Sequence, residues 1–397
     1  MTTSRLRVVL IVDNPLRDLS GIVLVAQQLC AHGAVCYLAP LNLEWWEVGA
    51  LAPDFVLLTN IRRTRQDFAH RLLEAGIQVG VLECEGGVMP SFETYETMLG
   101  PSPDLFKRIS CVCVWGPRLA RVAVDRGWYE ERQVTVTGAP RFDLYAPGWR
   151  LSALESSPDV ENVRTPFILV NGSFPRANPK FVTPEREIES AMRLGFNRDY
   201  LVRFQSAQMR GLVEMVAVAN RIAERFPDTT VIYRPHPFER VETYEPLLDR
   251  RGNLKLLQSG TVEGWILRAA CVVHSNSTTA IEAAIAGVPT FVPAWVSTAE
   301  KLDACDAVST HCHSFDNLAS QLALALEGRV TIDANGADVS RVIADWFYRI
   351  DGESHRRVAE AILSAAAGAH NAVSVKACRD IHYGKRPGQY TLRSWLG

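Results

Sequence analysis

Long hydrophobic runs are missing from this 397-residue sequence, and we expect no secretory leader. No stretch reaches the ~18 to 20 uninterrupted apolar residues that a membrane-spanning helix needs. The first residues become charged too soon for a signal peptide. We therefore expect a cytoplasmic protein.

Paired cysteines and an excess of one charge are missing as well. The nine cysteines contain no Cys-x-x-Cys pair and lie in apolar contexts such as Ser110–Trp115, which predicts reduced core thiols rather than metal ligands. The 42 Lys and Arg residues nearly balance the 44 Asp and Glu residues, for a formal net charge of −2. Electrostatic binding of nucleic acid by the whole chain is therefore excluded.

What is present is an alternation of short β-branched runs with stretches of helical period, which predicts an α/β fold with parallel sheets. At roughly 150 residues per domain the length predicts two to three domains. We expect strands at 7–12, 34–39, 54–59, 78–82, 111–115, 133–136, 167–171, 229–233, 254–257, 271–274 and 290–292. We expect helices at 20–32, 65–75, 200–226, 318–326, 339–346 and 353–367.

The pattern dissolves between 145 and 165 into prolines and serines, which is typical of a connector. We therefore predict a Rossmann-like domain over 1–160, a second over 161–345, and C-terminal helices with a tail over 346–397, for which packing back across the domains is one arrangement. Doubly wound domains bind ligands at the carboxyl ends of their strands, so we expect the chemistry there, around a central cleft.

The segment Val231–Phe238 joins a strand end to a histidine held between two prolines. Pro235 and Pro237 restrict the backbone around His236, so its ring projects with little freedom to lose on binding. His236 is suited to donate to a phosphate oxygen or to protonate a leaving phosphate, with Arg234 beside it. A capped turn histidine is the equally weighted alternative.

A second segment places five small polar residues between the strand at 271–274 and a helix. Free backbone N–H groups, the helix dipole and side-chain hydroxyls together suit a phosphate. Glu282, one turn into the helix, is placed to bond ribose hydroxyls. An ordinary capping box of Thr279 with Glu282 fits equally well. The five residues are Ser275, Asn276, Ser277, Thr278 and Thr279.

Three further segments carry charged or polar residues after strands. Glu83 and Glu85 precede a Gly-Gly pair at the end of the strand at 78–82. A Gly-Ala-Pro turn is followed by Arg141 and Asp143. The third segment, which begins at Phe167, contains Asn171, Ser173 and Arg176.

Together these segments resemble the GT-B glycosyltransferases that use CMP-activated acidic sugars, which carry a His-Pro motif and a paired Ser/Thr motif. The Gly-Ala-Pro-Arg-Phe-Asp and Arg-Pro-His-Pro elements are similar to those of proteins named surface carbohydrate biosynthesis proteins. The resemblance touches five places between about residues 80 and 290. Cys84 departs from it, because it occupies the first position of an acidic-acidic-Gly motif.

Within that group the retaining β-Kdo transferases are the most similar. The resemblance implies transfer of Kdo, or a related 2-keto acidic sugar, from CMP-Kdo to a surface glycan of capsule or lipopolysaccharide type. Asp143 would form a covalent adduct with the sugar, and Glu85, or less favourably Glu83, would handle the acceptor proton.

The same resemblance implies a donor site. His236 with Ser277 and Thr278 would hold the CMP phosphate, and Arg141 and Arg176 would pair with the sugar carboxylate. No metal and no cofactor are expected, since one phosphate can be neutralised by a helix terminus, His and Arg. The full set of expected donor-binding residues is Arg141, Asn171, Ser173, Arg176, Arg234, His236, Ser275, Asn276, Ser277, Thr278, Thr279 and Glu282.

Several alternatives stay open from the sequence. Asp143 could instead be a loop acid that fixes Arg141 by a salt bridge. The protein could resemble CDP-glycerol glycerophosphotransferases, nucleotide-sugar 2-epimerases acting on UDP-GlcNAc without an acceptor, or a non-catalytic nucleotide- or glycan-binding relative.

The expected partners are the CMP-activated acidic sugar and a glycan or glycolipid acceptor, with no nucleic acid. A partner transferase module and peripheral contact of the basic tail, Arg379–Arg393, with an inner membrane also stay open, although a solvated or packed tail is favoured.

Overall fold

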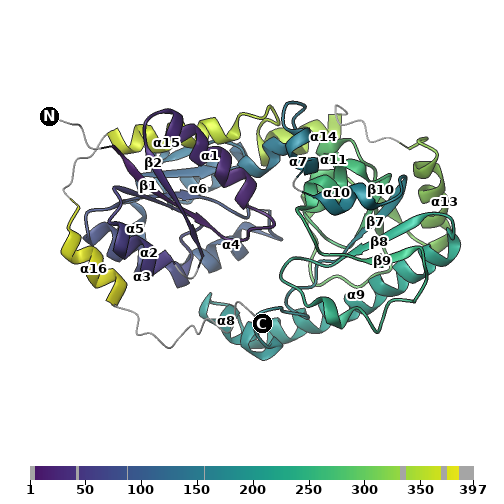
Figure 1. The fold of residues 1–397 in the computed structure, drawn as a ribbon. Helices are drawn as coiled ribbons and strands as arrows, with labels where there is room; N and C mark the ends of the chain where they lie inside the picture. Colours follow the sequence, from purple (N-terminus) through teal and green to yellow (C-terminus); the bar gives the residue numbers. More distant parts are fainter. Residues whose placement is uncertain are drawn as a thin grey trace. The chain divides into compact units, whose positions relative to one another are not determined.

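The computed structural model describes residues 5–41, 44–86, 88–155, 157–330, 337–367 and 373–383 (Figure 1). They fold into two compact α/β units. Unit 1 comprises Met1–Gly87, Tyr95–Asp143 and Asp345–Gly397, and unit 2 comprises Val88–Thr94 and Leu144–Ala344. The predicted α/β class with two doubly wound domains is confirmed.

Unit 1 contains a six-stranded sheet in the order β2-β1-β3-β4-β5-β6, and all neighbouring strands are parallel. Most residues of its inner strands are buried, as expected of a parallel sheet covered on both faces. The strands are β1 (Arg7–Val12), β2 (Val35–Pro40), β3 (Phe55–Leu58), β4 (Gln78–Leu82), β5 (Cys111–Val114) and β6 (Val134–Val136).

The helices of unit 1 form two layers around this sheet. Figure 1 shows α1 and α15 above the sheet and α2, α3, α5 and α16 below it. The helices are α1 (Leu19–Ala31), α2 (Glu44–Leu51), α3 (Gln66–Glu74), α4 (Phe92–Leu99), α5 (Pro103–Phe106), α6 (Pro117–Asp125), α15 (Ser354–Ala367) and α16 (Val375–Tyr383), with 3-10 turns at Arg63–Arg65, Glu131–Gln133 and Pro140–Tyr145.

The C-terminal segment belongs to unit 1. Val358, Ala359 and Ile362 of α15 enter the same hydrophobic core as Val8 and Leu10 of β1. Helix α16 packs against α2 and α3. The end of the predicted basic tail, including Tyr390 and Arg393, lies outside the described residues.

Unit 2 contains a second parallel sheet, in the order β12-β11-β10-β7-β8-β9. Its inner strands are short, β-branched and buried, which is why the sequence pattern located them. The strands are β7 (Phe167–Asn171), β8 (Thr230–Arg234), β9 (Leu254–Leu256), β10 (Cys271–His274), β11 (Thr290–Pro293) and β12 (Thr310–Cys312).

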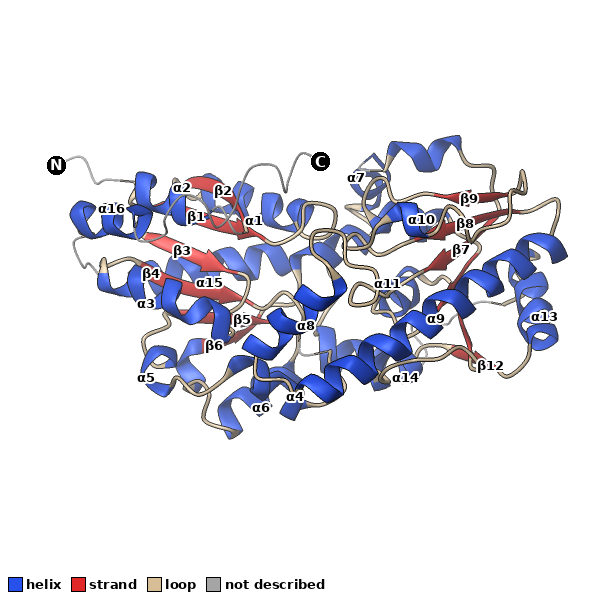
Figure 2. Ribbon diagram, turned by 90° about the horizontal axis from the view of Figure 1, so that it is seen from below, coloured by secondary structure: helices blue, strands red, loops and turns tan. Residues whose placement is uncertain are grey.

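Helices of unit 2 begin and end at recognisable signals. The long α9, prominent in Figure 2, begins after Asn197, whose side chain accepts from the amides of Asp199 and Tyr200. Helix α11 ends at Gly287, which adopts the left-handed conformation with φ 78°. The helices are α7 (Arg150–Glu155), α8 (Pro184–Arg193), α9 (Arg198–Arg225), α10 (Val262–Arg268), α11 (Thr279–Ala286), α12 (Asp303–Asp306), α13 (Phe315–Leu326) and α14 (Ala337–Val342), with short 3-10 or π turns at Pro158–Asn162, Val241–Thr243 and Ile343–Phe347.

The connector expected at 145–165 is structured and belongs to unit 2. Helix α7 packs against α10, and Ser157 donates from its hydroxyl to the carbonyl of Thr261 at 2.8 Å. The border between the units therefore falls between Asp143 and Leu144. Proline and serine composition signals a break in regular structure, but it does not report the tertiary contacts that assign a segment to one side.

Sequence periodicity located nearly all strands to within one or two residues, but it missed several helices, including α6 and α8 of nine and ten residues as well as shorter ones. Helices α2, α5, α10 and α12 have eight residues or fewer, too few turns to display a 3.6-residue period. Strand β12, Thr310–Cys312, lies at the edge of its sheet and is similarly too short.

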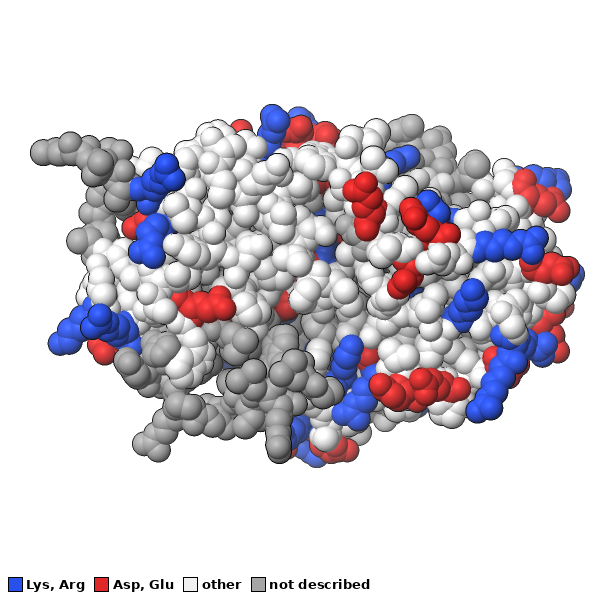
Figure 3. All heavy atoms as spheres, viewed as in Figure 1, with Lys and Arg blue, Asp and Glu red and all other residues white. Residues whose placement is uncertain are grey.

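Among the described residues, no helix combines the length and apolar character needed to cross a membrane. On the face drawn in Figure 3, charged side chains are sparse over unit 1 and mixed in sign over unit 2.

Gly21 brings α1 against the turn that follows β6. A Cβ atom at this position would lie 2.6 Å from the backbone nitrogen of Arg141 and 2.9 Å from the carbonyl carbon of Pro140. Because both are backbone atoms, Gly21→Ala should lower the free energy of unfolding by about 1–3 kcal/mol, measured by urea denaturation. The control Gly148→Ala, where nothing lies within 4 Å, should change it by less than about 0.5 kcal/mol. Equal effects of the two substitutions would contradict the close approach.

Candidate functional site

The strand order of unit 2 reverses between β7 and β10. From β7 the chain continues to β8 and β9 on one side, whereas β10, β11 and β12 lie on the other. Ligands of doubly wound sheets bind at such a switch point, outside the carboxyl ends of the strands. The pairing places Asn171, at the end of β7, level with Arg234 of β8 and His274 of β10.

This register brings the two strongest sequence motifs to one edge. The His236 turn follows β8, and the hydroxyl cluster follows β10, with β7 between them. Adjacent strands are about 4.8 Å apart, so the motifs flank Asn171 at a separation of roughly 10 Å. That span suits the phosphates and sugar ring of a nucleotide.

The hydroxyl cluster is preorganised around the start of α11. Ser277 and Thr279 share a hydroxyl–hydroxyl hydrogen bond of 2.9 Å, and Asn171 donates from Nδ2 to Oγ1 of Thr279 at 3.0 Å. Asn276 has a positive φ of 55° and is anchored through its side chain to the backbone of Glu300 and Leu302. Thr278 is the N-cap of α11 and makes no side-chain cap hydrogen bond, so the expected capping box is not formed.

Two buried polar atoms at this edge have no hydrogen-bond partner within the described part of the chain. They are Oδ1 of Asn171 and Oγ of Ser275, on residues that are both 3% exposed. Buried polar atoms are normally paired, because an unpaired one costs roughly 1–3 kcal/mol. An amide oxygen accepts and a hydroxyl can donate, so this edge suits a ligand that offers both kinds of group.

His274, absent from the predicted site, holds the hydroxyl cluster in place through the backbone of Ser277. Its Nδ1 accepts from the backbone N–H of Ser277 at 3.4 Å, so in the neutral ring Nε2 carries the proton, facing the hydroxyl of Ser309 at 2.9 Å. Ser309 in turn donates to the carbonyl of Cys305. A histidine ending a strand directly before a polar run was the sequence signal that could have identified it.

His236 is half-buried in the turn that follows β8. Its Nδ1 accepts from the backbone N–H of Phe238 at 3.2 Å, which leaves the proton of the neutral ring on Nε2. A ring in this tautomer offers Nε2–H as a donor, the role expected toward phosphate. Arg234, by contrast, is buried and donates to the carbonyls of Ser259 and Gly260, and burial lowers its pKa to about 10. Arg234 therefore holds the loop after β9.

Glu282 and the remaining expected donor residues have varied surroundings. Glu282 is 3% exposed and accepts from the hydroxyl of Tyr145 at 2.8 Å. Ser173 is half-buried in the loop after β7. Arg176 lies 3.8 Å from Glu187 and near the ring of Phe204, so its guanidinium already has an anionic neighbour.

In unit 1 the strand order reverses between β1 and β3, and polar residues again follow the strand ends. Glu83 is buried. Its Oε2 accepts from Tyr95 at 2.7 Å, and its Oε1 accepts from the amide of Glu85 at 3.0 Å and lies 3.6 Å from Arg62. These contacts make Glu83 a support for the loop, whereas the side chain of Glu85 is 39% exposed.

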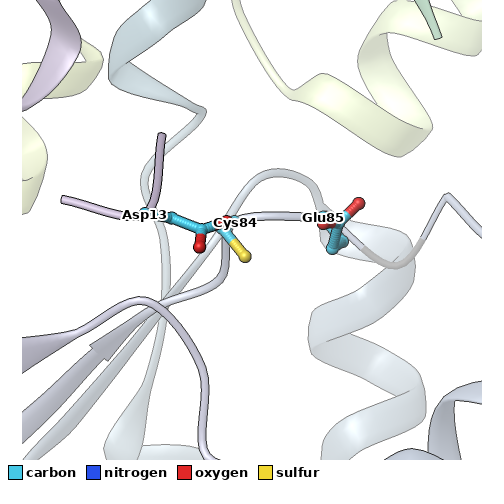
Figure 4. A group of neighbouring side chains, drawn as sticks. All are labelled: Asp13, Cys84 and Glu85. Carbon is cyan, nitrogen blue, oxygen red and sulfur yellow. The ribbon is translucent and has the colours of Figure 1, made fainter. Parts of the chain in front are cut away.

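Asp13, which sequence reasoning did not single out, joins Cys84 and Glu85 in one group (Figure 4). One ligand atom from each lies within 4.8 Å of the others. Arg17 contacts Asp13 at 2.6 Å and Glu85 at 3.4 Å, so a positive charge already serves both carboxylates and we propose no metal there. Burial raises the pKa of Asp13, which suits a group that exchanges protons. Its place directly after β1 was the available signal.

A small pocket, with about 30 Å³ open to water, lies beside this group. It is lined by the ends of β1, β3 and β4, by the start of α1 and by Arg141. The Arg141 guanidinium lies 4.8 Å from the centre of the Trp115 ring, and its Nε has no hydrogen-bond partner among the described residues. Arg141 thus stays a candidate anion ligand.

Asp143 is engaged in a structural role that neither sequence interpretation anticipated. It is 1% exposed, and its carboxylate accepts from the amides of Ser354 and His355 at 3.0 and 2.9 Å, with His355 Nδ1 also at 2.9 Å. It therefore caps the N-terminus of α15. The expected salt bridge to Arg141 is replaced by a 3.9 Å approach of Arg141 to Asp18. A carboxylate so enclosed is poorly placed to attack a sugar, and we do not carry forward its role as nucleophile.

Comparison with known proteins identifies the fold. The sequence matches no model of a known family and no curated protein. Among solved structures, the UDP-GlcNAc 2-epimerase of Methanocaldococcus jannaschii, in complex with UDP-GlcNAc and UDP, is similar with a TM-score of 0.53 and 14% identity, over 89% of this chain and 98% of that one.

Two further structures extend this likeness. The UDP-GlcNAc 2-epimerase of Neisseria meningitidis, bound to UDP-GlcNAc, has a TM-score of 0.53 at 11% identity, covering 90% of this chain and all (100%) of that one. The wall teichoic acid polymerase TagF has a TM-score of 0.56 at 10% identity, covering 91% of this chain and 89% of that one. The chain therefore has the GT-B-like fold that the sequence predicted, and the structures it resembles are of enzymes that act on nucleotide-activated substrates.

Asp143→Ala should lower the free energy of unfolding by about 2 kcal/mol, because it removes a helix cap and leaves His355 buried without its carboxylate. Chemical denaturation measures the loss, and amide hydrogen exchange should rise in Ser354–Ala367. Asp143→Asn, which retains an acceptor oxygen, should lose less than the alanine variant. A change below about 0.5 kcal/mol for Asp143→Ala would refute the cap.

His274 should make stability depend on pH. Burial lowers its pKa to about 3, below the ordinary 6.5, so the unfolded chain takes up a proton that the folded chain refuses. Stability should therefore fall as the pH drops below 6.5, by roughly 3 kcal/mol near pH 4.5. The difference from His274→Asn, measured by denaturation at each pH, isolates this contribution. Parallel pH profiles for the two proteins would rule it out.

Proposed function

We propose that this protein is an enzyme that acts on a nucleotide-activated sugar, held by unit 2 at the switch point between β7 and β10. The observation that carries the proposal is a pair of buried atoms without a hydrogen-bond partner among the described residues, Oδ1 of Asn171 and Oγ of Ser275. A nucleotide sugar supplies hydroxyl donors for the first and phosphate acceptors for the second.

The likeness to nucleotide-sugar enzymes supports the same conclusion from the fold. Two of the similar structures contain UDP-GlcNAc, and the third is a polymerase of wall teichoic acid. In unit 2 the α11 N-terminus and the hydroxyls of Ser277 and Thr279 would hold phosphate oxygens, with His236 donating from Nε2. Glu282 would accept from a ribose hydroxyl.

We favour 2-epimerisation of a UDP-activated amino sugar as the reaction. Carbon 2 of such a sugar carries no group that stabilises a carbanion, so its proton can leave only as the anomeric C–O bond to the diphosphate breaks and takes up the electron pair. Return of a proton to the opposite face of carbon 2 and re-formation of that bond complete the inversion, which therefore needs groups that remove and return a proton. Asp13 of unit 1, whose pKa is raised by burial, and the more exposed Glu85, with Arg17 between them, are groups of the chemical type that such proton transfers use. No nucleophilic carboxylate is needed, which agrees with the enclosed position of Asp143.

Glycosyl or glycerophosphate transfer is the second candidate, favoured by the likeness to the teichoic acid polymerase and by the motifs shared with CMP-Kdo transferases. Its donor would be CMP-Kdo or CDP-glycerol, and its acceptor a bacterial surface glycan. Arg141, with an unpartnered Nε in its pocket, would then hold an acidic group of donor or acceptor.

The two reactions are separated by incubating the protein with UDP-GlcNAc, CMP-Kdo or CDP-glycerol in heavy water, with and without glycan acceptors. Epimerisation should introduce deuterium at carbon 2 of the UDP sugar, seen by proton NMR, with no nucleotide released as part of turnover. Transfer should instead release CMP and depend on an acceptor. Binding and turnover of none of the three compounds would refute the proposal.

Ser275→Ala should weaken UDP binding about tenfold, because it removes one hydrogen bond to a charged phosphate worth roughly 1.4 kcal/mol. Isothermal titration calorimetry measures the affinity. The matched control is Ser320→Ala on the exposed face of α13, whose hydroxyl bonds only its own helix, and it should bind UDP as the wild type does. Equal affinities in both variants would remove Ser275 from the site.

A further inference from the structure

Glu239, three residues beyond His236, is a fully buried carboxyl that the proposed reaction does not use. Its Oε1 accepts from the backbone N–H of Phe174 at 2.7 Å and from that of His236 at 3.2 Å. Its Oε2 accepts from the hydroxyl of Tyr244. One oxygen thus links two separate segments of the chain.

Those segments are the ones that border the nucleotide site. Phe174 lies in the loop after β7, three residues beyond Asn171, and His236 lies in the turn after β8. The two segments are also joined by the backbone bond from Lys180 N–H to the carbonyl of Phe238, at 2.8 Å. Gln258, from the loop after β9, donates to the carbonyls of His236 and Glu239 at 2.7 and 3.1 Å.

Stability alone does not account for an acid at this position. Within the described chain Glu239 forms no ion pair, and the titratable groups that act on it are the phenols of Tyr233 and Tyr244. Burial raises its pKa to about 7, while its hydrogen bonds with Tyr244, Phe174 and His236 oppose the rise. An uncharged side chain would avoid that cost of burial. What the position requires is therefore an acceptor oxygen on a side chain long enough to contact the amides of both Phe174 and His236.

We propose that Glu239 is a positioning residue of the nucleotide site, and that its carboxyl sets the spacing between the loop after β7 and the His236 turn. The proposal rests on the proposed function, since the ligand is the one assigned to unit 2. The length of the Glu239 side chain, rather than its charge, is the property that matters for this spacing.

Two substitutions separate reach from charge. Glu239→Gln keeps an oxygen at the same distance and removes the charge, whereas Glu239→Asp keeps the charge and shortens the side chain by one methylene. With UDP as the probe in calorimetry, Glu239→Asp should bind at least tenfold more weakly and Glu239→Gln within threefold of the wild type. Glu44→Asp, a fully buried carboxylate of unit 1 paired with Arg65, is the matched control and should leave UDP affinity unchanged.

The proposal is overturned if Glu239→Asp binds UDP like the wild type, or if both Glu239 variants weaken binding equally. Failure of the proposed function has a different signature, namely that the wild type binds none of UDP, CMP or CDP-glycerol. In that case amide hydrogen exchange decides the positioning role without a ligand. Glu239→Asp should accelerate exchange in 172–178 and 234–239 together, and Glu239→Gln should not; exchange unchanged, or raised in only one segment, refutes the link.

Discussion

The reversal of strand order at β7 and β10 is the constraint on which the candidate site of unit 2 depends. Chain connections leave this point in opposite directions, so no crossover covers the carboxyl ends of the two strands. At this point Oδ1 of Asn171 and Oγ of Ser275 are buried and have no hydrogen-bond partner among the described residues. The free end of α11 and its hydroxyls complete a surface that suits a phosphate beside a sugar. The same reversal at β1 and β3 places the carboxylates of unit 1 after their strands.

Around both strand edges, several buried polar side chains hold loops or a helix end rather than face a ligand. Glu239 joins two loops, His274 supports Ser277, Arg234 holds the loop after β9, and Asp143 caps α15. A buried hydrogen bond fixes direction as well as distance, so it specifies loop geometry more narrowly than apolar packing does. This difference between residues that hold loops and residues that contact a ligand matters for interpreting variants. Substitution of a residue that holds a loop changes ligand affinity only by changing the position of that loop.

The motifs of the sequence lie after neighbouring strands of unit 2, and some of their residues have structural roles instead. His236, Ser277 and Glu282 share one sheet edge because their strands neighbour β7, a fact of strand order. Arg234 and Asp143 belong to the same motifs, yet their charged side chains form hydrogen bonds with backbone groups of the protein. Asp13 and His274 carried no motif and lie among the candidate residues, because each directly follows or ends a strand. A sequence motif indicates which residues lie near a site. It does not distinguish residues that contact the ligand from residues that hold the surrounding loops in place.

Local chemistry along the chain was sufficient for the α/β class, for the longer strands and helices, and for the two segments rich in hydroxyls and prolines. These features depend on the side-chain period and on backbone restriction, both of which are properties of neighbouring residues. Tertiary structure alone decided the strand order, the return of α15 and α16 to unit 1, and the partners of each buried charge. Those outcomes depend on contacts between residues far apart in the sequence, 212 positions for Asp143 and His355 and 287 for Gln78 and Ala365, and no local pattern encodes such a pairing.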